Sequence, residues 1–180
     1  MPRTVSDSIV IGTTPEHVYR RISDPALMGR WSPENVGATV VDPRPGGAYV
    51  GMQFDGHNRK NALLRGRHWP VPRWTTRCVV IAAESPAHFG FRVTLPILGD
   101  RSRPRLAMGV AAWEYRMRAV ADGTEVTETW VLEMPPWTIT CLMPLARFLV
   151  PHASPEKFQA CNIKATLAKL KSELEREAAG

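Results

Sequence analysis

The sequence is poor in cysteine and has no recognisable metal or nucleotide motif. Its 180 residues include three cysteines, Cys78, Cys141 and Cys161. The number is odd and no two lie at metal-ligand spacing, so neither a disulfide framework nor a zinc site is predicted. No His-x-x-x-His or Glu-x-x-His pair, no Ser/His/Asp constellation and no glycine-rich phosphate loop is visible, which disfavours a metalloenzyme or a hydrolase. We therefore expect reduced thiols and no cofactor.

An apolar signal region and a membrane-spanning run are also lacking. Residues 1–8 are polar, and the longest apolar stretch, residues 137–150, is interrupted by Pro144 and Arg147. That stretch is shorter than the roughly 20 apolar residues that a spanning helix needs. The sequence accordingly predicts a cytoplasmic protein.

Lysine is scarce, because 18 of the 23 basic residues are arginine. Against 17 acidic residues they give a net charge of +6, and a basic surface favours anionic partners such as nucleic acid or anionic lipid. The charges are scattered along the chain, which favours an ordinary solvated surface over a nucleic-acid patch. The length, with 44% hydrophobic and 22% charged residues, is typical of one globular domain.

Capping and turn residues predict where the helices and hairpins lie. Thr14-Pro15-Glu16 is typical of a helix start and predicts a helix over residues 15–22. Asp24-Pro25 repeats the signal for a second short helix that ends near Gly29. Asp122-Gly123, between two alternating runs, predicts a β-hairpin.

The rest of the chain predicts strands followed by one long helix. Ser154-Pro155-Glu156 begins an amphipathic pattern that runs to about residue 178, while residues 56–73 are predicted to form an extended loop. Segregated strands and helices predict an α+β domain with a mostly antiparallel sheet. The predicted strands cover residues 4–11, 37–42, 47–55, 74–84, 87–95, 107–120 and 124–134.

Alternation along these strands places large apolar side chains on one face of the sheet. Such a face has two interpretations, a core filled by the last helix or the lining of a ligand cavity. Glu128 shares the apolar face of its strand, where a carboxyl group has a raised pKa and suits a general acid or base. Alternatively, Glu128 pairs with an arginine, or a bulge turns it outward.

The order and spacing of several motifs resemble the SRPBCC superfamily, the START-like group, and within it the actinobacterial polyketide cyclase/dehydrase-like branch. The similarity covers about residues 5–175. It implies a helix-grip fold, in which a seven-stranded antiparallel sheet curls around the C-terminal helix, two short helices follow the first strand, and a hydrophobic cavity remains between sheet and helix. The motifs are Ile22-Ser23-Asp24-Pro25, Trp31-Ser32-Pro33-Glu34, Phe54-Asp55-Gly56-His57-Asn58-Arg59, Trp74 with Cys78-Val79, Phe89-Gly90-Phe91, Trp113-Glu114-Tyr115, and Gly123-Thr124-Glu125-Val126-Thr127-Glu128-Thr129-Trp130.

The resemblance implies a single ligand-binding domain over residues 1–180 but no shared catalytic set. Two segments depart from compact members, an insert at residues 60–73 and the apolar segment 137–150, which suits a lid or a homodimer interface. In the insert and beside it, basic residues alternate with tryptophan, a mixture found in solvated loops and in loops that bind nucleic acid or an anionic membrane surface. These residues are Arg65, Arg67, Trp69, Arg73, Trp74 and Arg77.

Three hypotheses follow, and the first is preferred. The domain binds a lipid, fatty acid or polyketide-like molecule in its cavity; or it is a cyclase or dehydrase that uses Glu128 to move protons; or it is an interaction protein that uses basic loops. Arg59 is expected to hold an anionic group of the ligand, or else to pair with Glu34 or Glu128. The predicted ligand-binding residues are Trp31, Phe54, Asn58, Arg59, Trp74, Thr76, Cys78, Phe89, Phe91, Trp113, Tyr115, Met117, Trp130 and Phe158, with Glu128 as the candidate catalytic residue.

Overall fold

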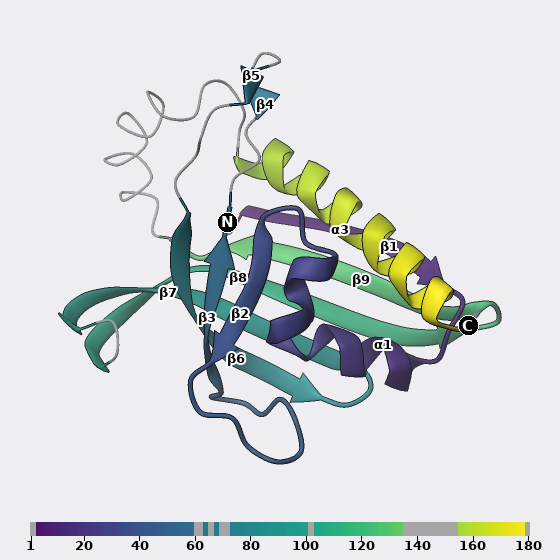
Figure 1. Ribbon diagram of the computed structural model, residues 1–180, viewed down its shortest axis with the longest axis horizontal. Helices are drawn as coiled ribbons and strands as arrows, with labels where there is room; N and C mark the ends of the chain where they lie inside the picture. Colours follow the sequence, from purple (N-terminus) through teal and green to yellow (C-terminus); the bar gives the residue numbers. More distant parts are fainter. Residues whose placement is uncertain are drawn as a thin grey trace.

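The computed structural model shows a seven-stranded antiparallel sheet that curls around one long helix (Figure 1). The structure describes residues 3–59, 63–64, 67–68, 73–100, 103–134 and 155–178. The helices are α1 (Pro15–Ile22), the 3-10 helix η1 (Pro25–Arg30) and α3 (Pro155–Ala178). The strands are β1 (Arg3–Ile11), β2 (Asn35–Val40), β3 (Gln53–Asn58), β4 (Leu63–Leu64), β5 (Arg67–His68), β6 (Trp74–Glu84), β7 (His88–Asp100), β8 (Arg103–Val120) and β9 (Gly123–Leu132).

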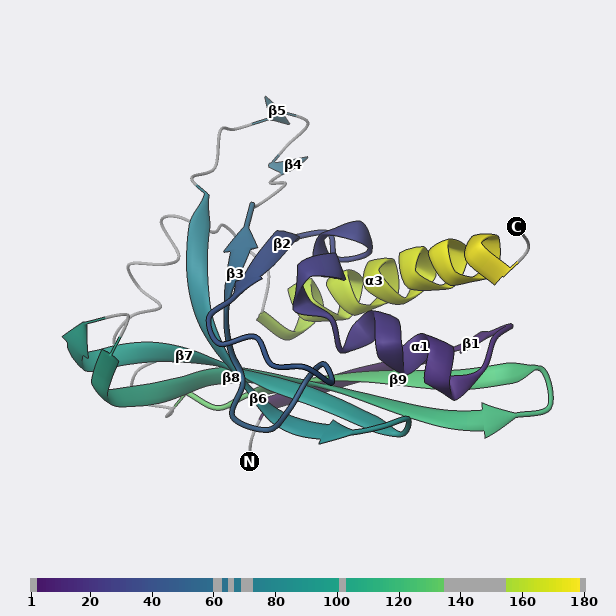
Figure 2. The ribbon, with the colours of Figure 1, turned by 60° about the horizontal axis from the view of Figure 1, so that its bottom comes forward.

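The strand order in the sheet is β1-β9-β8-β7-β6-β3-β2. The first strand therefore pairs with the last, and β2 forms the opposite edge, while β4 and β5 make a separate small hairpin. Figure 2 shows α1, η1 and α3 together on one side of the sheet. This arrangement confirms the α+β helix-grip fold that the sequence predicts.

The short helices begin where the capping residues place them. The Thr14 hydroxyl accepts a hydrogen bond from the His17 backbone N–H at 3.4 Å, with Pro15 at the first helical position. Asp24 caps the next helix in the same way, accepting from the Ala26 N–H at 3.0 Å. The second helix is 3-10 rather than α, a form common in pieces as short as six residues.

Three predicted strand boundaries are wrong by four residues or more. The strand predicted over residues 47–55 begins only at Gln53, because Gly46, Gly47 and Gly51 have φ values of 100°, 88° and 90°, which belong to turns. The strands predicted to end at residue 95 and to begin at residue 107 instead continue to a pair between Asp100 and Arg103. Irregular register at this end of β7 and β8 accommodates residues that break the simple alternation.

The predicted hairpin after residue 122 joins β8 to β9, with Val120 paired to Gly123. Gly123 has a φ of 129°, and a side chain there would collide with the Ile11 carbonyl oxygen. The turn therefore packs directly on the end of β1, which only glycine allows.

The core lies between α3 and the concave face of the sheet. Four apolar side chains at helical spacing on α3 are each at most 2% exposed. Tyr115, Val126 and Trp130 are buried on the sheet face opposite them, as the alternation predicts. The α3 residues are Ile163, Leu167, Leu170 and Leu174.

Several predictions concern residues outside the described ranges. These are the apolar segment 137–150, the start of the last helix at Ser154, Cys141, and most of the insert 60–73 with Arg65 and Trp69. Among the described residues, no helix is long and apolar enough to cross a membrane. Within the same ranges, no group of three His, Cys, Asp or Glu side chains is placed to hold a metal ion.

Candidate functional site

A pocket of about 160 Å³ lies between the sheet, α3 and the segment that joins η1 to β2. Strands β3, β6, β7, β8 and β9 supply one wall, and one face of α3 supplies the opposite wall. The pocket is lined by Met28, Trp31, Ser32, Pro33, Glu34, Asn35, Phe54, Asn58, Trp74, Thr76, Cys78, Phe91, Trp113, Tyr115, Glu128, Gln159, Asn162, Ile163 and Thr166.

The structure brings most of the predicted site residues to this pocket. Nine of the fourteen predicted ligand-binding residues line it, together with Glu128. The nine are Trp31, Phe54, Asn58, Trp74, Thr76, Cys78, Phe91, Trp113 and Tyr115.

The other five predicted residues do not line the pocket. Phe89, Met117 and Trp130 are buried in the core farther along their strands. Phe158 is half-buried on the first turn of α3. Arg59 is exposed just beyond β3, where its backbone N–H donates to the Glu34 carbonyl oxygen at 2.8 Å.

Sequence reasoning missed Met28 and two further sets of lining residues. Gln159, Asn162, Ile163 and Thr166 follow the i, i+3, i+4, i+7 spacing of one helical face, a signal that could have identified them. Residues 32–35 were not among the predicted ligand-binding residues, and the position of this segment over the pocket follows from the pairing of β2 with β3.

Stacked aromatic rings form one side of the pocket. Phe91 and Trp113 lie almost parallel, with ring centroids 5.6 Å apart and an interplanar angle of 7°. Phe54 contacts Phe91 edge-on, with ring centroids 5.4 Å apart. Trp130, which is buried in the core, contacts Trp113 edge-on, with ring centroids 6.5 Å apart. Their cross-strand positions, such as Phe91 opposite Trp113, fix these contacts. The result is a flat apolar wall that suits a planar group.

Glu128 lies on the buried face of β9, directly opposite Tyr115 of β8. Its side chain is part of the pocket lining and only 2% of the residue is exposed. The Tyr115 hydroxyl donates to Glu128 Oε1 at 3.0 Å. Oε2 is buried, and among the residues that the structure describes it has no hydrogen-bond partner and Glu128 forms no ion pair.

Burial raises the pKa of Glu128 to about 8, and the hydrogen bond from Tyr115 only partly opposes that effect. The neutral acid is therefore the dominant form at pH 7. Burial, together with the nearby Glu128 carboxyl group, also raises the pKa of Tyr115 well above its ordinary value, so the phenol keeps its proton. The pair is a neutral proton donor inside a largely apolar pocket.

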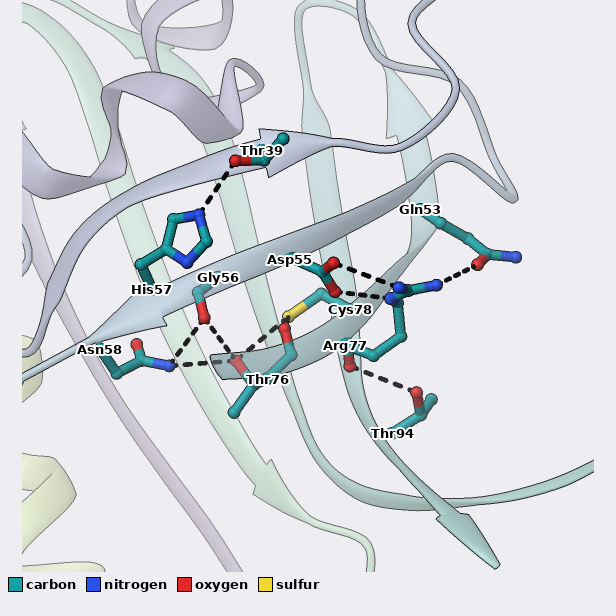
Figure 3. A network of polar contacts seen from close by, with 10 residues as sticks. All are labelled: Thr39, Gln53, Asp55, Gly56, His57, Asn58, Thr76, Arg77, Cys78 and Thr94. Atoms are coloured by element: carbon teal, nitrogen blue, oxygen red, sulfur yellow. Dashed lines mark hydrogen bonds and ion pairs between the residues drawn. The ribbon is translucent and has the colours of Figure 1, made fainter. Parts of the chain in front are cut away.

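The part of the sheet wall formed by β3 and β6 carries polar groups that already form hydrogen bonds with one another (Figure 3). Asn58 Nδ2 donates to the Gly56 carbonyl at 3.2 Å and to Thr76 Oγ1 at 3.1 Å, and Asn58 Oδ1 accepts from Asn35 Nδ2 at 3.4 Å. Burial raises the pKa of the neighbouring Cys78 thiol to about 12, so this sulfur is not a nucleophile at neutral pH.

On the outer face of β3 and β6, an ion pair fastens the two strands that carry this wall. The Arg77 guanidinium donates to both oxygens of Asp55, at 2.6 and 3.1 Å, and also to Gln53 (Figure 3). Such a bidentate pair fixes the relative position of the strands. The pair thereby helps to keep the inner-facing Thr76 and Cys78 in place along the pocket.

Comparison with known proteins gives one family match. A family model described as "Polyketide cyclase / dehydrase and lipid transport" matches residues 2–175. A comparison with curated proteins gives no match.

Solved structures of similar fold cover almost all of the chain. The Polyketide_cyc-like protein Cgl2372 from Corynebacterium glutamicum is 26% identical, with 99% of this chain and 94% of that chain covered and a TM-score of 0.55. The AHSA1-like protein from Aeromonas hydrophila is 16% identical, with coverage of 99% and 96% and a TM-score of 0.60. The di-domain ARO/CYC StfQ from the steffimycin biosynthetic pathway is 12% identical, with coverage of 100% and 53% and a TM-score of 0.65.

Proposed function

Because the chain belongs to the polyketide cyclase/dehydrase and lipid transport family, we propose that residues 1–180 form one domain that binds a small hydrophobic or amphipathic ligand in the pocket between the sheet and α3. The ligand class is a lipid, fatty acid or polyketide-like molecule. One observation carries the proposal. A pocket with six aromatic residues in its lining holds a buried, neutral carboxylic acid whose Oε2 has no protein partner among the described residues.

The volume of the pocket supports binding of a ring or a short chain segment. An engineered cavity of about 150 Å³ in another protein binds benzene, whereas drug-sized ligands occupy sites of about 300–1,000 Å³. At about 160 Å³, the described pocket accommodates a ring-sized group. A larger ligand would place one ring or chain end against Phe91 and Trp113 and extend past Trp74, which is 38% exposed.

A pocket-filling substitution tests the proposal. Thr76→Phe places a large ring in the pocket, so it should weaken binding of acetophenone, a ring-sized probe, by at least about tenfold. Thr75→Phe is the matched control, because Thr75 is exposed on the same strand and faces away from the pocket. Binding is followed by titration of backbone amide NMR shifts.

Wild type and Thr75→Phe should bind acetophenone equally well. The proposal fails if the wild-type protein shows no saturable binding, or if Thr76→Phe binds as tightly as Thr75→Phe in a folded sample.

Proton transfer is a second candidate function, and the raised pKa of Glu128 is the observation that favours it. An acid with a pKa near the working pH is effective both as a donor and as an acceptor. Glu128, held by Tyr115, could protonate a carbonyl oxygen or take a proton from an adjacent carbon during cyclisation or dehydration. Incubation with a poly-β-keto thioester separates the two functions, because only an enzyme would convert it faster than the uncatalysed reaction in buffer.

A further inference from the structure

Two buried polar atoms on residues that line the pocket have no hydrogen-bond partner among the described residues. They are Oε2 of Glu128, from the sheet, and Nδ2 of Asn162, from the helix opposite. Burying a polar group without a partner costs about 1–3 kcal/mol in proteins. Two such atoms lining one pocket are therefore a place where a bound molecule would gain hydrogen bonds.

Both atoms are donors. An amide nitrogen donates only. Glu128 accepts from the Tyr115 hydroxyl at Oε1, so the proton of the neutral acid is on Oε2. The polar groups on β3 and β6 already have hydrogen-bond partners, because Asn58 and Thr76 bond to one another and to the backbone. Among the described residues that line the pocket, the buried side-chain atoms without a partner are thus both donors.

We infer that the group bound between Glu128 and Asn162 is an oxygen acceptor of the carbonyl type, carried by a planar ring or chain that lies against Phe91 and Trp113. A carbonyl oxygen has two lone pairs and no proton, so it accepts from both donors at once. The inference rests on the proposed function, and it names the ligand chemistry that the pocket recognises.

The test measures the hydrogen bonds of acetophenone labelled with ¹³C at its carbonyl carbon. In the complex with the wild-type protein at pH 6, its carbonyl ¹³C shift should lie at or downfield of its value in water. A carbonyl ¹³C shift equal to that of acetophenone dissolved in an alkane would overturn the inference, because it would show an oxygen that accepts no hydrogen bond.

A substitution cycle gives an independent readout that cancels the different hydration of the two probes. α-Methylstyrene has the shape of acetophenone, with a CH₂ group in place of the oxygen. Asn162→Leu should lower the affinity ratio of acetophenone to α-methylstyrene by about tenfold, the loss expected for one buried hydrogen bond. Lys164→Leu, at an exposed position on the same helix, should leave the ratio unchanged.

The inference is contradicted if Asn162→Leu and Lys164→Leu give the same ratio. If Asn162→Leu does not fold, the carbonyl shift in the wild-type complex decides alone. Suppose that both probes bind saturably but the carbonyl ¹³C shift of bound acetophenone equals its value in an alkane solvent. That result overturns this inference and leaves the proposed function standing. Absence of any binding overturns both.

Discussion

Glu128→Gln should remove a loss of stability that the wild-type protein suffers between about pH 4.5 and pH 8. The folded-state pKa of Glu128 is about 8, above the ordinary value of 4.5, so the native protein binds this proton more tightly than the unfolded chain does. The stabilisation of the folded state by the proton on Glu128 is complete below pH 4.5 and is lost as the pH rises through 8. At 1.36 kcal/mol per pKa unit, the loss at pH 8 is on the order of 4 kcal/mol.

Glutamine keeps the shape of the side chain and an oxygen that accepts from Tyr115, but it carries no titrating proton. Urea unfolding at pH 5, 6, 7 and 8 should show the two proteins converging at pH 5, with Glu128→Gln more stable by several kcal/mol at pH 8. The difference between the two proteins isolates the contribution of Glu128, because every other titratable group is the same in both.

Glu125→Gln is the control. Glu125 lies on the same strand but faces outward, where it pairs with Arg118. This variant should follow the pH dependence of the wild-type protein from pH 5 to 8. If the free energy of unfolding of the wild-type protein changed with pH in parallel with that of Glu128→Gln over this range, the result would contradict a buried, neutral Glu128.

Leu170→Ala should lower the free energy of unfolding by about 2–5 kcal/mol, the range measured for buried leucines. Leu170 is 0% exposed and lies in the middle of the apolar stripe by which α3 packs on the sheet. The substitution leaves a void in that contact, and alanine is a better helix former than leucine, so helix propensity is not the cause. Lys169→Ala, at an exposed position one residue away, should change stability by less than about 0.5 kcal/mol.

Denaturant unfolding of both variants measures the difference. A loss below about 1 kcal/mol for Leu170→Ala would show that α3 is not packed on the sheet through this stripe, and the pocket wall would then lack its support.

The fold was predictable because local signals agree with one another. Thr14 and Asp24 cap the short helices, Asp122-Gly123 forms the hairpin, and alternation along β6–β9 sorts the two faces of the sheet. The strand ends between residues 95 and 107 were mispredicted. Turn-forming residues such as Gly99 locally predict the end of a strand, whereas the pairing of β7 with β8 continues both strands past these residues.

The site was predictable to a lesser degree, since it depends on contacts between distant segments. Alternation indicates that Tyr115 and Glu128 face the same side, but their hydrogen bond depends on register. Counting back from the turn at Asp122-Gly123 pairs these two residues, so that signal was present in the sequence. The position of residues 32–35 over the pocket has no such local signal, because the edge pairing of β2 with β3 determines it.

The most direct test of the account is the location of a bound ring. Intermolecular nuclear Overhauser effects from acetophenone to the wild-type protein should appear on side chains of both walls, at Phe91 and Trp113 of the sheet and at Ile163 of α3. Contacts confined to the outer face of the sheet, or to α1 and the loop after β2, would contradict a ligand pocket between the sheet and the C-terminal helix.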